Sequence, residues 1–154
     1  RKMLNENIST KTNLWKRMFA GLIDYFLMFG MFYVICLYFG KYNGHGYELG
    51  GFSSLSVILI WLLYMIGLEL SFGGTFGNLI FNLKVISIHP KKTSLTFDQS
   101  FKRHLFDILE MWPFGLIGIL LIKNTKYNQR LGDIWAKTIV IDIKDDNQFY
   151  KRFV

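Results

Sequence analysis

The sequence predicts an α-helical integral membrane protein with two transmembrane helices, a re-entrant or interfacial helix pair, and a small cytoplasmic β-hairpin or sheet. Of the 154 residues, 51% are hydrophobic and 18% aromatic, which is more than an ordinary soluble domain needs. Two apolar runs approach or exceed the length that crosses a bilayer. The net charge is +7, and its Lys and Arg residues stand at the ends of these runs and between them, as expected beside anionic lipid.

Residues 18–39 form the first expected transmembrane helix. The run has about the twenty residues that span a hydrocarbon core, and Asp24 is the one charged residue inside it. Trp15 and Arg17 precede the run and Tyr38 ends it, as interfacial anchors do. No Ala-x-Ala-like cleavage site accompanies it, so we expect a permanent helix rather than a signal peptide.

Residues 55–72 form the second expected transmembrane helix, which Gly73 and Gly74 end. Glu69 stands near the far end of this run. A carboxylate at that depth reaches the membrane interface, so we expect Glu69 to be solvated and to have little further role.

Three short segments show the alternation of a β-strand. Residues 83–88 and 94–97 flank turn residues and predict a β-hairpin outside the membrane. Residues 138–143 alternate in the same way and could pair with 83–88, which would leave fewer open sheet edges. We therefore expect a small three-stranded cytoplasmic sheet.

Residues 99–122 predict an amphipathic segment followed by an apolar one. Asp98 can cap its start, and Pro113 lies between the two halves. Only about twelve residues are fully apolar, which is short for a crossing and favours a re-entrant segment over a third transmembrane helix. The stripe on its polar face is either the solvated side of an interfacial helix or the lining of a pocket; it consists of Arg103, Asp107 and Glu110.

The distribution of basic residues predicts the orientation. The amino end and residues 84–103 are rich in Lys and Arg, whereas the loop 40–54 holds only Lys41, so the amino end and the hairpin are expected in the cytoplasm. The segment 123–137 is also basic, and a re-entrant third segment would leave it on the same side. A polar tail (1–13) and a charged tail (144–154) flank the membrane domain 14–143.

Charged residues near the membrane interior predict a paired cluster, because an unpaired charge there costs several kcal/mol. Arg17 and Asp24 share a helix face but lie about 10 Å apart along the axis, so a third group or water is expected between them. The candidates for that group are Asp133, Asp107, Glu110 and Arg103. Arg17 could instead serve as an interfacial anchor. Asp133 could cap a turn, or pair with Arg17 or Arg130.

Three separated blocks of sequence resemble the RDD family, which is named for one arginine and two aspartates. RMFAGLID, GGTFGNLIFNLKVI and QRLGDIWAKTIVI resemble its opening, central and closing motifs between about residues 17 and 141. The resemblance maps the name-giving residues onto Arg17, Asp24 and Asp133. It departs at Asn78, where the family usually has Lys or Arg, and at Asn82, where Gly is common. The resemblance implies a multi-pass protein of the bacterial cytoplasmic membrane with a transport role.

Other functional classes have little support in the sequence. No nucleophile motif or Gly-rich phosphate loop appears, so an enzyme is not expected. The single cysteine, Cys36, and three dispersed histidines predict neither a metal site nor a cofactor. Most aromatic residues lie inside apolar runs, which argues against nucleic-acid binding.

We therefore expect a transport-related protein that handles an ion or small ligand through an embedded Arg/Asp network. The alternative is an accessory, scaffold or assembly subunit of a larger membrane complex. The expected partners are the lipid bilayer and either further copies of the chain or other membrane subunits.

Overall fold

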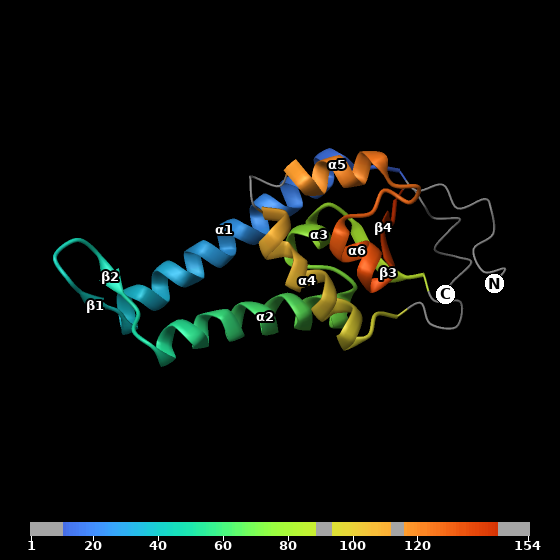
Figure 1. Ribbon diagram of the computed structural model, residues 1–154. Coiled ribbons are helices and arrows are strands. Elements are labelled where there is room, and N and C mark those ends of the chain that lie inside the picture. Colours follow the sequence, from blue (N-terminus) through green and yellow to red (C-terminus); the bar gives the residue numbers. More distant parts are fainter. Residues whose placement is uncertain (1–10, 89–93, 112–115, 145–154) are drawn as a thin grey trace.

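The computed structural model describes residues 11–88, 94–111 and 116–144. Two long helices, α1 (Leu14–Phe39) and α2 (Phe52–Phe72), extend from a smaller compact part (Figure 1). Their far ends are joined by a hairpin of two short strands, β1 (Lys41–Tyr42) and β2 (Tyr47–Glu48). The α1 and α2 helices contain the two apolar runs expected to cross a membrane.

The compact part follows α2. It comprises α3 (Phe76–Ile80), β3 (Leu83–Ser87), α4 (Phe97–Met111), α5 (Leu116–Asn124), α6 (Leu131–Ala136) and β4 (Thr138–Asp142). The α4 helix packs against α6 and the end of α2, while α3 packs against α1. The chain is thus mostly helical, with two small antiparallel sheets among the described residues.

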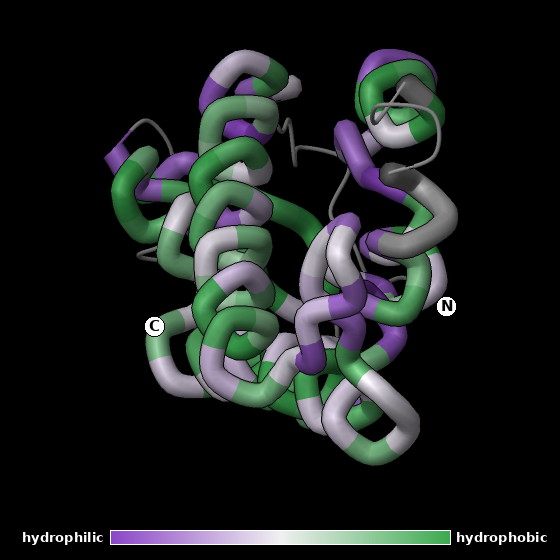
Figure 2. Tube along the Cα trace, turned by 90° about the vertical axis from the view of Figure 1, so that its left-hand side faces the viewer, coloured by the Kyte–Doolittle hydropathy of each residue, from purple (hydrophilic) through white to green (hydrophobic). Residues whose placement is uncertain are grey.

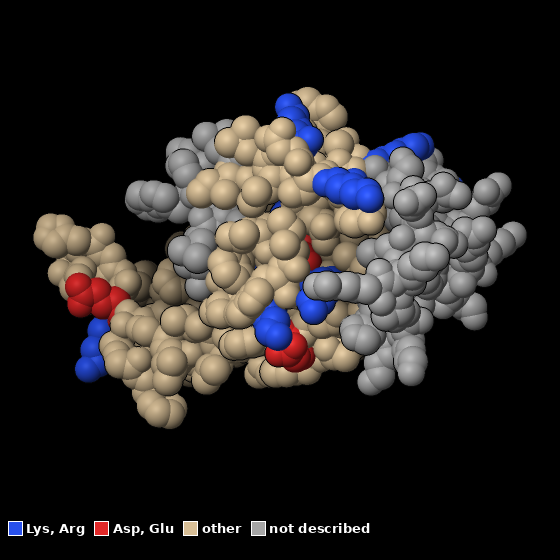
Figure 3. Space-filling model, turned by 45° about the vertical axis from the view of Figure 1, so that its right-hand side comes forward, with Lys and Arg blue, Asp and Glu red and all other residues tan. Residues whose placement is uncertain are grey.

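The long helices expose apolar surface that a soluble core helix would bury. Only 11% of the most apolar stretch of α1 is buried. The second candidate span, Phe52–Ile80, comprises α2 and α3, and 28% of its most apolar stretch is buried. Green, hydrophobic residues line much of these helices in Figure 2. In Figure 3 charged side chains lie at the hairpin tip and over the compact part, with uncharged surface between them. A contiguous apolar surface of this kind is typical of contact with lipid.

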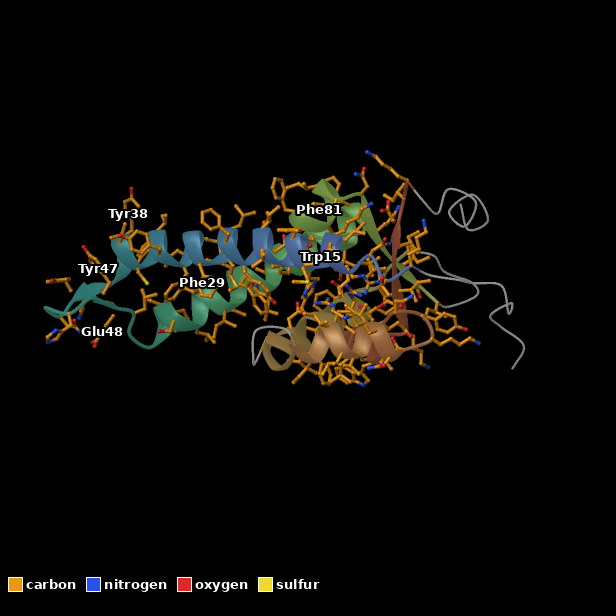
Figure 4. The ribbon with its side chains drawn as sticks, turned by 90° about the horizontal axis from the view of Figure 1, so that it is seen from above. Trp15, Phe29, Tyr38, Tyr47, Glu48 and Phe81 are labelled. Carbon is orange, nitrogen blue, oxygen red and sulfur yellow. The ribbon has the colours of Figure 1, made fainter. Side chains whose placement is uncertain are left out.

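Aromatic side chains mark both ends of this apolar surface. Trp15 stacks on Phe19, which stacks on Phe81, near the compact part. Tyr42 and Tyr47 pack edge to face at the hairpin, beyond Tyr38 (Figure 4). At 1.5 Å per residue, Trp15 and Tyr38 lie about 34 Å apart along α1, close to the thickness of a hydrocarbon core.

The predicted pairing of the segments 83–88 and 138–143 is confirmed, but the third strand is wrong. β3 and β4 pair antiparallel with Val85 opposite Val140, and nearly all their side chains are buried. Residues 94–96 form no strand, and α4 begins at Phe97. This sheet, expected to have three strands, therefore has two among the described residues.

A capping box explains why α4 begins there. The Thr96 hydroxyl accepts a hydrogen bond from the Gln99 backbone N–H, and Gln99 Oε1 accepts one from the Thr96 N–H. This reciprocal arrangement stabilises a helix start. Asp98, the expected cap, lies in the first turn instead.

The segment 99–122 is divided between two helices, α4 and α5, and the predicted bend at Pro113 lies outside the described residues. The nine residues of α5 reach only about 13 Å, less than half of a hydrocarbon core. The re-entrant interpretation stays a prediction.

Candidate functional site

Asp24 docks α3 onto α1. Its side chain is buried and accepts hydrogen bonds from Thr75 Oγ1 at 2.5 Å and from the Gly77 backbone N–H at 2.8 Å. A Cβ on Gly77 would lie 2.1 Å from the Ala20 carbonyl oxygen, so only glycine permits this approach. The spacing of Ala20 and Asp24 on one face of α1 therefore positions a close backbone contact and the carboxylate that fastens it.

Glu69 and Arg103 join α2 to α4. Both side chains are almost completely buried, and Arg103 Nε donates to Glu69 Oε1 at 3.0 Å. Ser100 Oγ donates to Glu69 Oε2 at 2.5 Å, and His104 Nε2 lies 3.4 Å from the same oxygen. The expectation that Glu69 is solvated is wrong, because α4 covers the end of α2 on which it lies.

Asp133, which lies on α6, is the second carboxylate that pairs with Arg103. Arg103 Nη1 forms a salt bridge with Asp133 and donates to Thr138 Oγ1 at 3.1 Å. The other carboxylate oxygen of Asp133 accepts from the Arg130 backbone N–H at 3.0 Å. A Cβ on Gly132 would lie 2.7 Å from the Arg103 carbonyl oxygen, so α6 also approaches α4 through a glycine.

Arg17 reaches the same aspartate from α1. Its Nη1 lies 3.8 Å from Asp133 Oδ2, and its guanidinium donates to the carbonyls of Asn128 at 2.7 Å and Val140 at 3.1 Å. The sequence predicted a third group or water between Arg17 and Asp24. Among the described residues no side chain contacts both, because the two residues bind different partners. Arg17 therefore ties α1 to β4 and to the segment before α6, while Asp24 ties it to α3.

Asp107 and His104 form a second buried pair on α4. His104 Nδ1 lies 2.7 Å from Asp107 Oδ2, and Arg130 Nη1 donates to Asp107 Oδ1 at 3.2 Å. Burial by itself would raise the pKa of Asp107, but Arg130 and His104 outweigh it and hold that pKa below its usual range. Burial would lower the pKa of His104, yet Asp107 and Glu69 raise it to about 9. His104 is therefore a cation at neutral pH.

A cavity of about 830 Å³ lies between α1, α4 and α5. Its volume falls within the range of about 300–1,000 Å³ that is usual for small-molecule sites. Its charged lining comes from α1, α4 and the start of α6, and its remaining walls are mainly apolar. The charged lining residues are Arg17, Asp24, Arg103, His104, Asp107 and Arg130.

The structure thus brings six of the seven predicted residues into one region. Five of them line the cavity, Asp133 lies behind it as the partner of Arg103, and the side chain of Glu110 lies outside the described residues. Arg103 and Asp107 are buried, so the solvated-face interpretation of this stripe is wrong and the pocket-lining one fits.

Sequence reasoning missed Glu69 and His104. The pairing of Glu69 with Arg103 spans 34 positions and has no local signal. A weak signal existed on α4, because Ser100, Arg103, His104 and Asp107 follow one another at spacings of three, one and three and share a face.

A comparison with protein-family models finds a match that covers the sequence blocks from which this site is built. The model of the family described as "RDD family" matches residues 11–137, a range that includes every charged residue named in this subsection. No curated protein and no solved structure matches the chain.

Proposed function

Because this chain belongs to the RDD family, we propose that it is a transport-related protein of the bacterial cytoplasmic membrane whose cavity between α1, α4 and α5 holds a small ligand or ion. The observation that carries the proposal is the position of Asp24. It is a buried carboxylate within the apolar run 18–39 of α1, and it lines the cavity. Ionisable groups at such positions are costly and usually mark ion or substrate paths.

The exposed apolar surfaces of α1 and α2 support residence in the membrane. In our proposal both helices cross it, with the compact part and the amino end in the cytoplasm and the β1–β2 hairpin outside. The basic residues near the compact part and their scarcity in the loop 40–54 support this orientation.

In the proposed mechanism Asp24 takes up and releases a proton or cation. Its two hydrogen-bond donors, Thr75 and Gly77, hold the carboxylate at the cavity wall in one orientation. Arg17 lines the same cavity and keeps its place through Asp133 and two backbone carbonyls. Two crossing helices rarely enclose a path by themselves, so we propose that the functional unit is a homo-oligomer.

The second candidate function is that of an accessory subunit, and the completeness of the Arg103 contacts favours it. Glu69, Asp133 and Thr138 bind this guanidinium, as a purely structural ion cluster would. In this case the charged residues fix the shape of a scaffold that captures another membrane protein.

Flux in proteoliposomes tests the transport proposal. Vesicles that hold the purified protein and a pH-sensitive dye are given a gradient of Na⁺ or K⁺. We expect cation-dependent proton movement that D24N abolishes. D98N is the matched control, because Asp98 is exposed and pairs with Lys102 on the surface of α4.

A flux that D24N leaves unchanged would contradict the role of Asp24. Absence of flux from the native protein, together with a stoichiometric foreign subunit after purification in mild detergent, would favour the accessory function.

A further inference from the structure

The cavity has a charged region and an apolar region that follow the axis of α1. Arg17 and Asp24 lie among apolar lining residues of α1 such as Met18 and Leu22, and the lining continues to Phe29 near the middle of the helix (Figure 4). Arg17 and Phe29 are about 18 Å apart along the helix axis. Ile119 and Ile122 of α5 extend the apolar wall.

The charges on the cavity wall favour an anion. Four cationic side chains line it, those of Arg17, Arg103, His104 and Arg130, against the two carboxylates of Asp24 and Asp107. Glu69 and Asp133 compensate Arg103 from behind the wall, and Asp107 pairs with His104 and Arg130. Arg17 has the weakest ion pair of the four cations, with Asp133 Oδ2 3.8 Å from its Nη1.

Unsatisfied polar atoms point to the same sign of charge. Among the described residues, the buried side-chain atoms without a hydrogen-bond partner are all nitrogens, and Arg17 Nε and His104 Nε2 belong to cavity-lining residues. His104 Nε2 faces Glu69, whereas Arg17 Nε has no acceptor, so the Arg17 guanidinium is the less satisfied of these two cations. The Arg17 side chain is 7% exposed, and a buried N–H without an acceptor is costly.

We propose that the ligand of this cavity is an amphiphile with one anionic headgroup, a carboxylate or phosphate, bound near Arg17, with its apolar chain along α1 toward Phe29. The proposal rests on the proposed function, since it names the class of ligand that the cavity holds. A bare anion would leave the apolar walls against water or empty space, whereas an acyl chain covers them. A cation would be repelled by the weakly paired guanidinium of Arg17.

Ligand binding to the full chain in mild detergent tests the proposal. The probe is a dansyl-labelled undecanoic acid, whose fluorescence rises in an apolar site. We expect dodecanoate and dodecyl phosphate to displace it, dodecanol to be weaker by about tenfold or more, and inorganic phosphate to have no effect. Equal competition by dodecanol, or displacement by inorganic phosphate alone, would overturn the proposal.

A pair of glycine variants locates the site. G21L fills the cavity wall, and the space next to Gly21 accepts a Cβ because its nearest neighbour, Tyr25, would be 3.9 Å away. G30L adds the same side chain to the same helix outside the cavity lining, where nothing lies within 4 Å of the added Cβ. We expect G21L to weaken probe binding about tenfold or more and G30L to leave it unchanged. Native affinity in G21L would overturn the assignment.

The outcomes separate this inference from the proposed function. Displaceable probe binding without any flux would retain the ligand class and contradict transport. Cation-coupled flux without probe binding would retain transport and contradict the amphiphile.

Discussion

Asp24 and Asp133 are both buried aspartates, but their partners differ in kind. Asp24 accepts hydrogen bonds from a neutral hydroxyl and a backbone N–H, whereas Asp133 faces the guanidinium groups of Arg103 and Arg17. Removal of one partner from a buried ion pair strands the other charge, which costs about 3–5 kcal/mol, while a hydrogen bond from an uncharged donor to a carboxylate contributes about 1.5–3 kcal/mol. The residues named together in the family motif therefore have different roles.

Asn82 provides a prediction at the residue scale. It adopts φ = 57° between α3 and β3, a conformation that glycine adopts without strain. We expect N82A to lower the free energy of unfolding by about 1 kcal/mol, because alanine is strained in this conformation. N82G should match or exceed the native stability, and equal melting temperatures for all three proteins would contradict this explanation.

His104 predicts a pH dependence of stability. Its pKa is raised from 6.5 to about 9, so the folded chain binds more protons than the unfolded chain between these values. The stabilisation, on the order of 3 kcal/mol, should be complete below pH 6.5 and disappear as the pH rises through 9.

Thermal unfolding followed by tryptophan fluorescence from pH 6 to pH 10 measures this effect. The difference between the native protein and H104Q should shrink over this interval. H45Q, which changes an exposed loop histidine, serves as the control and should leave the profile unchanged. A constant difference between native protein and H104Q would contradict the assigned proton.

The contact between α1 and α3 gives a prediction at the scale of elements. G77A would place a methyl group 2.1 Å from the Ala20 carbonyl, so α3 must move away and weaken both hydrogen bonds to Asp24. We expect a loss of about 3 kcal/mol or more of stability, at the upper end of overpacking effects. G67A in α2 is the control, since its Cβ meets open space. Equal melting temperatures for the two variants would contradict the close approach.

Element prediction succeeded for the two long apolar runs and for one strand pair, and it failed for a short alternating segment and for the burial of Glu69. The apolar runs of α1 and α2 follow from composition alone, and the pairing of 83–88 with 138–143 was predicted from their alternation and from the expectation that both lie on one side of the membrane. The alternation over 94–97 gave a wrong strand, because the reciprocal bonds of Thr96 and Gln99 start a helix there. The burial of Glu69 depends on where α4 packs, which no local pattern contains.

The orientation of the whole molecule is a prediction of its own. Cys36 is the single cysteine of the sequence, so a C36S background permits labelling of one introduced thiol at a time. We expect a membrane-impermeant maleimide to label H45C in the exposed β1–β2 turn of intact cells, and to label T12C only after the membrane is opened. Labelling of both from outside, or the reverse pattern, would contradict the proposed orientation.

The central claim is that Asp24 serves transport while the Arg103 contacts hold the molecule together. The most direct measurement follows proton flux and thermal stability on the same preparations of D24N and D133N. In D24N the amide oxygen can still accept from Gly77 and its N–H can donate to the Thr75 hydroxyl, so we expect a loss of about 1 kcal/mol of stability and complete loss of flux. D133N should lose about 3–5 kcal/mol. If D24N instead retains flux, or loses fold and flux together as D133N does, the account is contradicted.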